Sequence, residues 1–249
     1  MTDLLPDRPS SMRNILRFFK KVILSILGRE LFFRREIRPP TEFHGSAYGG
    51  WAILANSLTK DSRVISVGIG VDASFDLSLI GKYNCLVHAY DPTPIAVQWV
   101  AANVHDRRFV LHEFALAGSD GVLELYPPKG AGGDSASCVK YEHTAETPMR
   151  VPCRTLDSVL HELKFDRVDI LKIDIEGAEY QVIHRSLADG SLEKVGQFLV
   201  EFHHAFPAFG LTATRQAVGA LRASGWKIAW VSPSHHEMLF IKGPRPSGK

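Results

Sequence analysis

The sequence has few cysteines, no long apolar run and little net charge. Its three cysteines, Cys85, Cys138 and Cys153, show no C-x-x-C spacing, which argues against a disulfide framework or a zinc site and favours a reducing compartment. No apolar run approaches the ~18–20 residues of a spanning helix. The net charge of +2 by itself predicts no nucleic-acid partner. We therefore expect an ordinary globular protein of the cytoplasm.

Charge is unevenly distributed along the 249 residues. Through Arg38, nine Lys or Arg stand against four Asp or Glu, whereas the remainder carries 20 against 23. Residues 12–33 have the pattern of a basic amphipathic helix, without the cleavage site of a secretory signal. Such a helix either attaches to a membrane surface or packs on the domain or a partner chain. Two prolines follow, so we expect a helical extension over 1–40 and one domain over 41–249.

From residue 41 onward, helical and strand patterns alternate, which predicts a mostly parallel sheet covered on both faces. The expected helices cover 50–58, 74–82, 94–103, 156–163, 178–188 and 212–224. The expected strands cover 64–67, 85–90, 109–114, 122–126, 168–173, 198–202, 226–231 and 237–241. Only five residues join the last two strands, so these should form an antiparallel hairpin. A seven-stranded, Rossmann-like α/β sheet that ends in such a hairpin is the layout of class I methyltransferases.

A glycine turn follows the first strand of this alternation. Gly68 and Gly70 lack Cβ atoms where a ligand must lie against the backbone, and a G-x-G between strand and helix indicates a nucleotide site. Asp91 closes the next strand 21 residues after Gly70. A carboxylate there can accept hydrogen bonds from both ribose hydroxyls. The alternative for Asp91 is a turn-starting residue before Pro92.

Asp72 distinguishes between two nucleotide cofactors. A nicotinamide cofactor places its diphosphate at the N-terminus of the helix after the glycines, where Asp72 and Asp76 would repel it. S-adenosylmethionine (SAM) has no phosphate and carries an ammonium and a sulfonium, which suit acidic surroundings. Asp72 also fits the N-cap of the helix. The sequence therefore favours SAM.

The apolar stretch 168–173 predicts a buried strand that nevertheless carries Lys172 and ends on Asp174, with Glu176 close behind. Ligands of open α/β sheets bind just outside the carboxyl ends of the strands, and charges are rarely buried without a partner or a task. We expect these three residues at the reaction site. The alternatives are a structural ion pair for Lys172 and favourable acids at a helix start.

The next strand should end beside Asp174 and bring Glu201 and His203 to the same crevice. Lys172 is expected to pair with Asp174 or Glu201. His203 is our leading proton acceptor, because an imidazole titrates near neutral pH; its alternative is a surface or supporting role. Asp174, Glu201 and His203 also have atoms that suit a divalent cation, although no ligand spacing indicates one.

Three apolar or aromatic residues are candidates for covering the cofactor. Tyr48 and Trp51 either cover it or fill the core. Leu116, after the third strand, is a candidate for contact with the adenine.

Four segments together resemble the FkbM-type SAM-dependent methyltransferases: Ser66–Gly70, Asp91-Pro92, Arg154–Asp157 and Leu171–Glu179. The resemblance covers roughly residues 45–242, and the K-I-D-x-E-G-x-E element is its most specific part. It implies a class I methyltransferase fold, SAM as methyl donor, and usually O-methylation of a sugar or natural-product hydroxyl. By position it assigns Gly68, Gly70 and Asp91 to the cofactor, and Asp174 and Glu176 to the reaction site.

Two departures, Ser66 where most members have an acid and Asp72 where most have glycine, indicate a divergent branch. The expected partner is a small-molecule or glycan acceptor. Two other functions stay open: an NAD(P)-dependent Rossmann oxidoreductase, and a SAM-binding scaffold that recruits partners through its basic leader.

Overall fold

The computed structural model describes residues 31–130 and 135–242, within a chain that divides by its contacts into residues 1–34 and residues 35–249. The amphipathic helix predicted for 12–33 falls, up to residue 30, outside the described residues. In the part of the chain that the structure describes, no helix has the length and apolar character needed to cross a membrane. All that follows concerns the larger unit.

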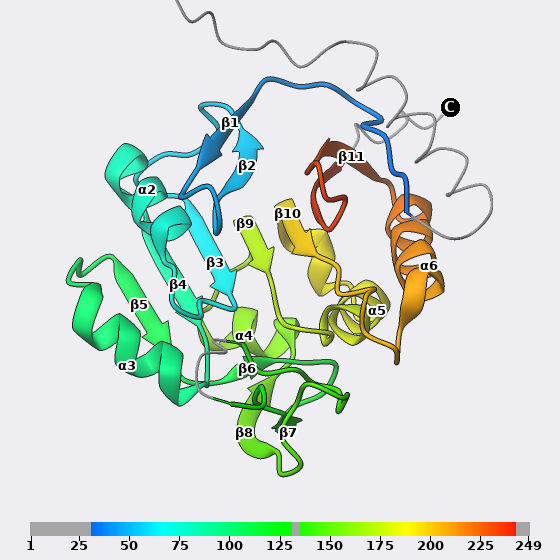
Figure 1. The fold of residues 1–249 in the computed structure, drawn as a ribbon. Coiled ribbons are helices and arrows are strands. Elements are labelled where there is room, and N and C mark those ends of the chain that lie inside the picture. The colour runs from blue at the N-terminus through cyan, green and yellow to red at the C-terminus, as the bar shows by residue number, and fades with distance from the viewer. Residues whose placement is uncertain (1–30, 131–134, 243–249) are drawn as a thin grey trace, which may run out of the picture. The chain divides into compact units, whose positions relative to one another are not determined.

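A seven-stranded mixed sheet organises this unit, with the strand order β11-β12-β10-β9-β3-β4-β5 (Figure 1). Neighbours from β10 to β5 are parallel, whereas β12 runs antiparallel to both β10 and β11. The predicted fold class and its terminal hairpin are thereby confirmed. The strands are β3 (Arg63–Val67), β4 (Leu86–Tyr90), β5 (Phe109–His112), β9 (Val168–Ile173), β10 (Val195–Glu201), β11 (Trp226–Val231) and β12 (Glu237–Lys242).

Helices connect these strands, and three of them start or end at residues that favour a helix terminus. Pro94 opens α3 at a position where its missing N–H costs nothing. Thr155 caps α4 by accepting the Ser158 N–H, and Asn84 ends α2 in the left-handed conformation. Figure 1 shows α2 and α3 beside β4 and β5, and α5 and α6 beside β10 and β11. The helices are α2 (Ser74–Tyr83), α3 (Pro94–Asn103), α4 (Leu156–Glu162), α5 (Glu179–Ala188), the 3-10 turn η1 (Ser191–Lys194) and α6 (Gly210–Ala223).

Two small sheets flank the main one. The hairpin β1 (Thr41–His44) and β2 (Trp51–Leu54) is antiparallel, and β6 (Ala115–Leu116), β8 (Met149–Arg154) and β7 (Gly121–Leu125) form a three-stranded sheet. The helix predicted over 50–58 is wrong, because this segment pairs with β1 and buries three consecutive side chains. The strand predicted at 122–126 is confirmed as β7; the sequence analysis did not predict β1, β6 or β8.

The central strands have apolar side chains buried on both faces, as the continuous apolar runs require. Ile170 and Leu171 of β9 are fully buried, and so are Phe198 and Leu199 of β10. The register aligns Val67 at the end of β3 with the last residues of β4 and β9. The residues that follow these three strands therefore emerge at one edge of the sheet.

Candidate functional site

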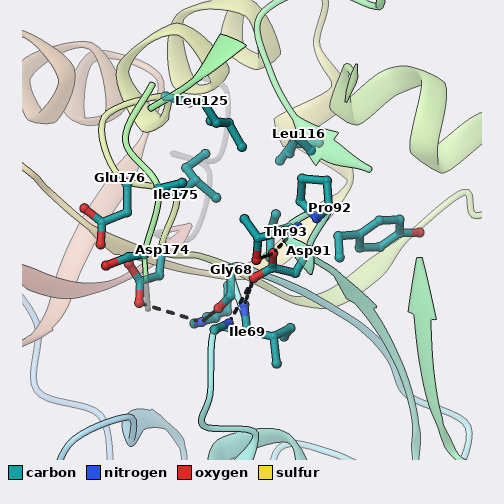
Figure 2. A pocket seen from close by; sticks show the side chains of 18 of the residues that line it. Gly68, Ile69, Asp91, Pro92, Thr93, Leu116, Leu125, Asp174, Ile175 and Glu176 are labelled. Atoms are coloured by element: carbon teal, nitrogen blue, oxygen red, sulfur yellow. Dashed lines mark hydrogen bonds and ion pairs between the residues drawn. The ribbon is translucent and has the colours of Figure 1, made fainter. Parts of the chain in front are cut away.

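A pocket lies at this edge, where β3, β4 and β9 end (Figure 2). Figure 2 shows Asp174 and Glu176 on one side of the pocket and Asp91 on the other, with Leu116 and Leu125 across from the glycine turn. The structure does not bring Glu201 and His203 into the lining; they lie behind Asp174 and Glu176. Ten predicted residues do line it: Tyr48, Trp51, Gly68, Gly70, Asp72, Asp91, Leu116, Lys172, Asp174 and Glu176.

Gly68 follows β3 and lies against the backbone of Asp174, the residue that follows β9. Its φ is +81°, and a Cβ placed on it would lie 1.6 Å from the carbonyl oxygen of Asp174. The Asp174 N–H donates to the carbonyl of Val67 at 3.0 Å, and the Gly68 N–H donates to Tyr90 at 2.9 Å. Glycine is thus required for the approach of two strand ends, a reason that the sequence pattern did not reveal.

The Asp91 carboxylate holds the glycine turn in place. One oxygen accepts the N–H groups of Ile69 and Gly70, both at 2.9 Å. The other accepts the Thr93 N–H at 2.9 Å and the Thr93 hydroxyl at 2.6 Å. A carboxylate has about four acceptor positions, so the protein fills them all. A ribose hydroxyl can bind Asp91 by replacing the Thr93 hydroxyl, since that donor alone among the four can rotate away.

Asp72 anchors the β1–β2 hairpin to the rim of the pocket. It accepts the Ser46 hydroxyl at 2.7 Å and the Ser74 N–H at 2.7 Å. Although burial opposes ionisation, the hydrogen bonds from Ser74 and Ser46 lower the pKa of Asp72, which therefore stays anionic. The same hairpin carries Tyr48, whose side chain is 81% exposed at the rim.

Lys172 lies at the floor of the pocket. Its ammonium donates to the Gly68 carbonyl at 2.5 Å and lies 3.9 Å from the Asp174 carboxylate. The predicted pairing with Asp174 is therefore present. The ammonium also lies 5.8 Å from the ring centroid of Trp51, which belongs to the buried core.

An apolar wall faces the acids across the pocket. The three-stranded sheet supplies Leu116 from β6 together with Leu123 and Leu125 from β7. The sequence analysis named Leu116 and missed the other two. Their alternation along 121–125 is the signal that could have placed them on one face.

His203 stands at the centre of a carboxylate cluster behind the pocket. Its Nε2 lies 3.7 Å from Asp174, 3.5 Å from Glu176 and 4.0 Å from Glu201. Its Nδ1 lies 3.2 Å from Glu179, a fully buried residue that also accepts the N–H of His203 at 2.8 Å. Glu179 was quoted within the family motif but not predicted as a site residue.

The cluster shifts the protonation of its members. Burial alone would lower the pKa of His203, but Glu179, Glu176 and Asp174 raise it to about 10. Burial first, and then Asp174, raises the pKa of Glu201 to about 8; burial likewise raises that of Glu176. Such groups titrate as a unit. The imidazole thus carries a proton at neutral pH in the free protein, which changes how the predicted proton acceptor can act.

A second buried acid lies under the glycine turn. Asp76 of α2 is 2% exposed, and neither its Oδ1 nor the Ser66 hydroxyl of β3 has a hydrogen-bond partner among the described residues. Burial raises the pKa of Asp76 to about 6. Asp76 was expected near the cofactor, but it lies outside the pocket lining.

The strand order, the terminal antiparallel hairpin and the pocket at the carboxyl ends define the class I methyltransferase fold. Within that class, residues 67–241 match the family described as the methyltransferase FkbM domain. This chain belongs to that family, which confirms the resemblance seen in its motifs.

Relatives and solved structures are more distant. Methyltransferase-like protein 24 of the rat (Rattus norvegicus) is 28% identical over 161 residues, which cover 64% of this chain and 38% of the rat protein. The human (Homo sapiens) protein is 25% identical over 160 residues, with coverages of 64% and 37%. The chain thus spans less than two fifths of these curated relatives.

Two solved structures show a remote similarity. Fibrillarin of Aeropyrum pernix with natively bound SAM has a TM-score of 0.42 and 11% identity, over 76% of this chain and 69% of that one. A methyltransferase from Pyrococcus furiosus has a TM-score of 0.37 and 12% identity, over 94% of this chain and 100% of that one.

Proposed function

We propose that this domain transfers a methyl group from SAM to a hydroxyl oxygen of a sugar, glycan or natural-product-like acceptor. The observation that carries the proposal is the pocket with a polar turn, an apolar wall and a carboxylate cluster at its three sides. The turn at Gly68–Asp72 suits the methionine end of SAM, because Asp72 is anionic and no phosphate must be held there. The wall of leucines suits the adenine.

Methyl transfer from a sulfonium is an in-line displacement, so much of the rate comes from holding the donor carbon and the acceptor oxygen about 3–3.5 Å apart. The hydroxyl must also lose its proton as the bond forms. Asp174 and Glu176 line the pocket and face the acceptor side. We therefore propose that the carboxylate cluster accepts the hydroxyl proton through these two residues. His203 then serves to orient and charge-balance them, because it holds its own proton in the free protein. Lys172 positions Asp174.

Charge-neutral variants test this assignment. Asp174→Asn and Glu176→Gln should bind SAM with nearly unchanged affinity but lose about 100-fold or more of turnover, the usual worth of general acid–base assistance. Asp61→Asn, at a side chain that is 78% exposed and does not line the pocket, is the matched control and should keep full turnover.

The acceptor can be found with radiolabelled SAM offered against glycans, lipid-linked sugars and small alcohols. Label transferred to a hydroxyl supports the proposal. Label transferred to an amine or a thiol and to no hydroxyl would contradict O-methylation while leaving methyl transfer intact.

A further inference from the structure

Among the residues that the structure describes, one mixed group of side chains is arranged as ligands usually are. One ligand atom each from Asp174, Glu176 and His203 lies within 4.8 Å of the others. The three come from the loop after β9 and the loop after β10, two parallel neighbours whose register places these loops side by side. Nothing in the family match or in the relatives assigns a metal to this place.

The histidine is oriented from outside the group. Glu179 is fully buried, accepts the N–H of Gly177 and of His203 at 2.8 Å each, and lies 3.2 Å from Nδ1 of the imidazole. Metal-bound histidines nearly always donate their second ring N–H to such a carboxylate, which fixes the tautomer and the ring plane. With Nδ1–H directed at Glu179, the Nε2 atom points at the carboxylates.

That orientation places several carboxylate oxygens around one ring nitrogen. Three carboxylates, Asp174, Glu176 and Glu201, have an oxygen 3.5–4.0 Å from Nε2. The oxygens and Nε2 thus converge on one point from two neighbouring loops. A cation at that point would be attracted by the carboxylates.

The distances favour room for an ion. Ligand oxygens and nitrogens lie about 2.0–2.2 Å from a small divalent metal, so neighbouring ligand atoms are separated by about 3 Å. Nε2 lies 3.5 Å from Glu176 and 3.7 Å from Asp174. A small rotation of these two carboxylates would bring their oxygens to the separation that a bound ion requires. The side chains of Asp174 and Glu176 are 32% and 25% exposed, so they can move and an ion can enter.

We propose that Asp174, Glu176 and His203, supported by Glu179 and with Glu201 as a fourth ligand, bind one divalent cation at the acceptor end of the pocket. Two or three carboxylates with one imidazole suit a divalent ion that accepts both oxygen and nitrogen ligands. Mn²⁺ is such an ion. A cation there would favour oxygen-rich acceptors, such as a vicinal diol. That consequence rests on the proposed function, whereas metal binding itself does not.

The test treats the full chain with a chelator and then measures Mn²⁺ binding. Binding is detected as the loss of the free-Mn²⁺ signal in electron paramagnetic resonance. We expect one Mn²⁺ per chain without SAM or acceptor. Changing a residue that merely orients a ligand costs about 10–100-fold in affinity, so Asp174→Asn and Glu176→Gln should each weaken binding at least 10-fold. Asp61→Asn, which removes one exposed negative charge elsewhere, should leave it unchanged.

Thermal melts of each variant show whether it is folded, and two independent ligand variants guard against the failure of one. The proposal is overturned if the wild-type chain leaves all Mn²⁺ free, or if the Asp61 control weakens binding as much as the ligand variants. Because the readout needs neither methyl donor nor acceptor, a negative result would leave the methyltransferase proposal standing.

Discussion

Gly68 is the residue on which the geometry of the pocket depends most directly. Its positive φ is strained for any residue with a Cβ, and the nearby Asp174 carbonyl is backbone that cannot rotate away. A change at Gly68 would separate β3 from β9 and shift the carboxylate that follows β9. The pocket and the stability of the sheet are therefore coupled at this one position.

Gly68→Ala should lower the free energy of unfolding by at least about 3 kcal/mol and abolish SAM binding, because strain and a backbone clash add. The measurement is denaturant unfolding alongside a SAM titration. Gly81→Ala is the control: this helical glycine has open space around its Cβ position, and alanine there should stabilise by about 0.5–1 kcal/mol. Equal stability of the two variants would refute the role given to Gly68.

Single residues also show how far the sequence could predict the site. Asp174 and Glu176 were identified because a buried strand that ends in acids is conspicuous in the sequence. The actual partners of Asp91 could not be foreseen, since hydrogen bonds to Ile69 and Thr93 depend on how the turn closes. Glu179 was not predicted for the same reason. In the sequence it is one more acid at the start of a helix, whereas its burial against His203 depends on the tertiary structure.

Among the elements, α2 and β3 bury the carboxyl of Asp76 and the hydroxyl of Ser66. Asp76 has an ordinary pKa near 3.8 when unfolded and about 6 when folded. Between these values the folded state binds more protons, so the stability conferred by the protonated acid is complete below about pH 4 and is lost as the pH rises through 6. The shift of about two pKa units corresponds to roughly 3 kcal/mol.

Asp76→Asn keeps the volume of the side chain but cannot ionise. Between pH 4 and 7, we expect the free energy of unfolding to fall less for this variant than for the wild type. The difference between the two falls should be roughly 2–3 kcal/mol. Urea unfolding at a series of pH values measures this, with Asp61→Asn as a charge-matched control that should keep the wild-type slope. Parallel pH profiles for Asp76→Asn and the wild type would show that Asp76 does not cause the loss of stability with rising pH.

The elements also mark where sequence patterns mislead. The run from Trp51 to Ile53 is apolar without alternation, so periodicity alone could not tell helix from strand, and pairing with β1 decided it. Strand β8 contains Pro152, which argues against a strand in a sequence pattern. It forms nonetheless in a small sheet, paired with β6 and β7. The buried apolar strand β9, and the helix α3 with Pro94 at its start, were placed correctly to the residue.

Across the whole molecule, the parallel strand order does what no single motif can. It places the ends of β3, β4 and β9 side by side, so that residues as far apart in sequence as Tyr48 and Ala178 line one pocket. The alternation of helices and strands and the closing hairpin were enough to predict this arrangement. The acceptor cannot be predicted in the same way, because its recognition depends on the shape of the pocket and its surrounding loops rather than on the strand order.

The central claim is that this pocket holds SAM rather than a dinucleotide. Isothermal titration of SAM into the full chain, with NADH titrated in parallel, tests it most directly. The account predicts saturable binding of one SAM per chain and no binding of NADH, since Asp72 would face the diphosphate. Saturable binding of NADH, or no heat with SAM, would contradict it.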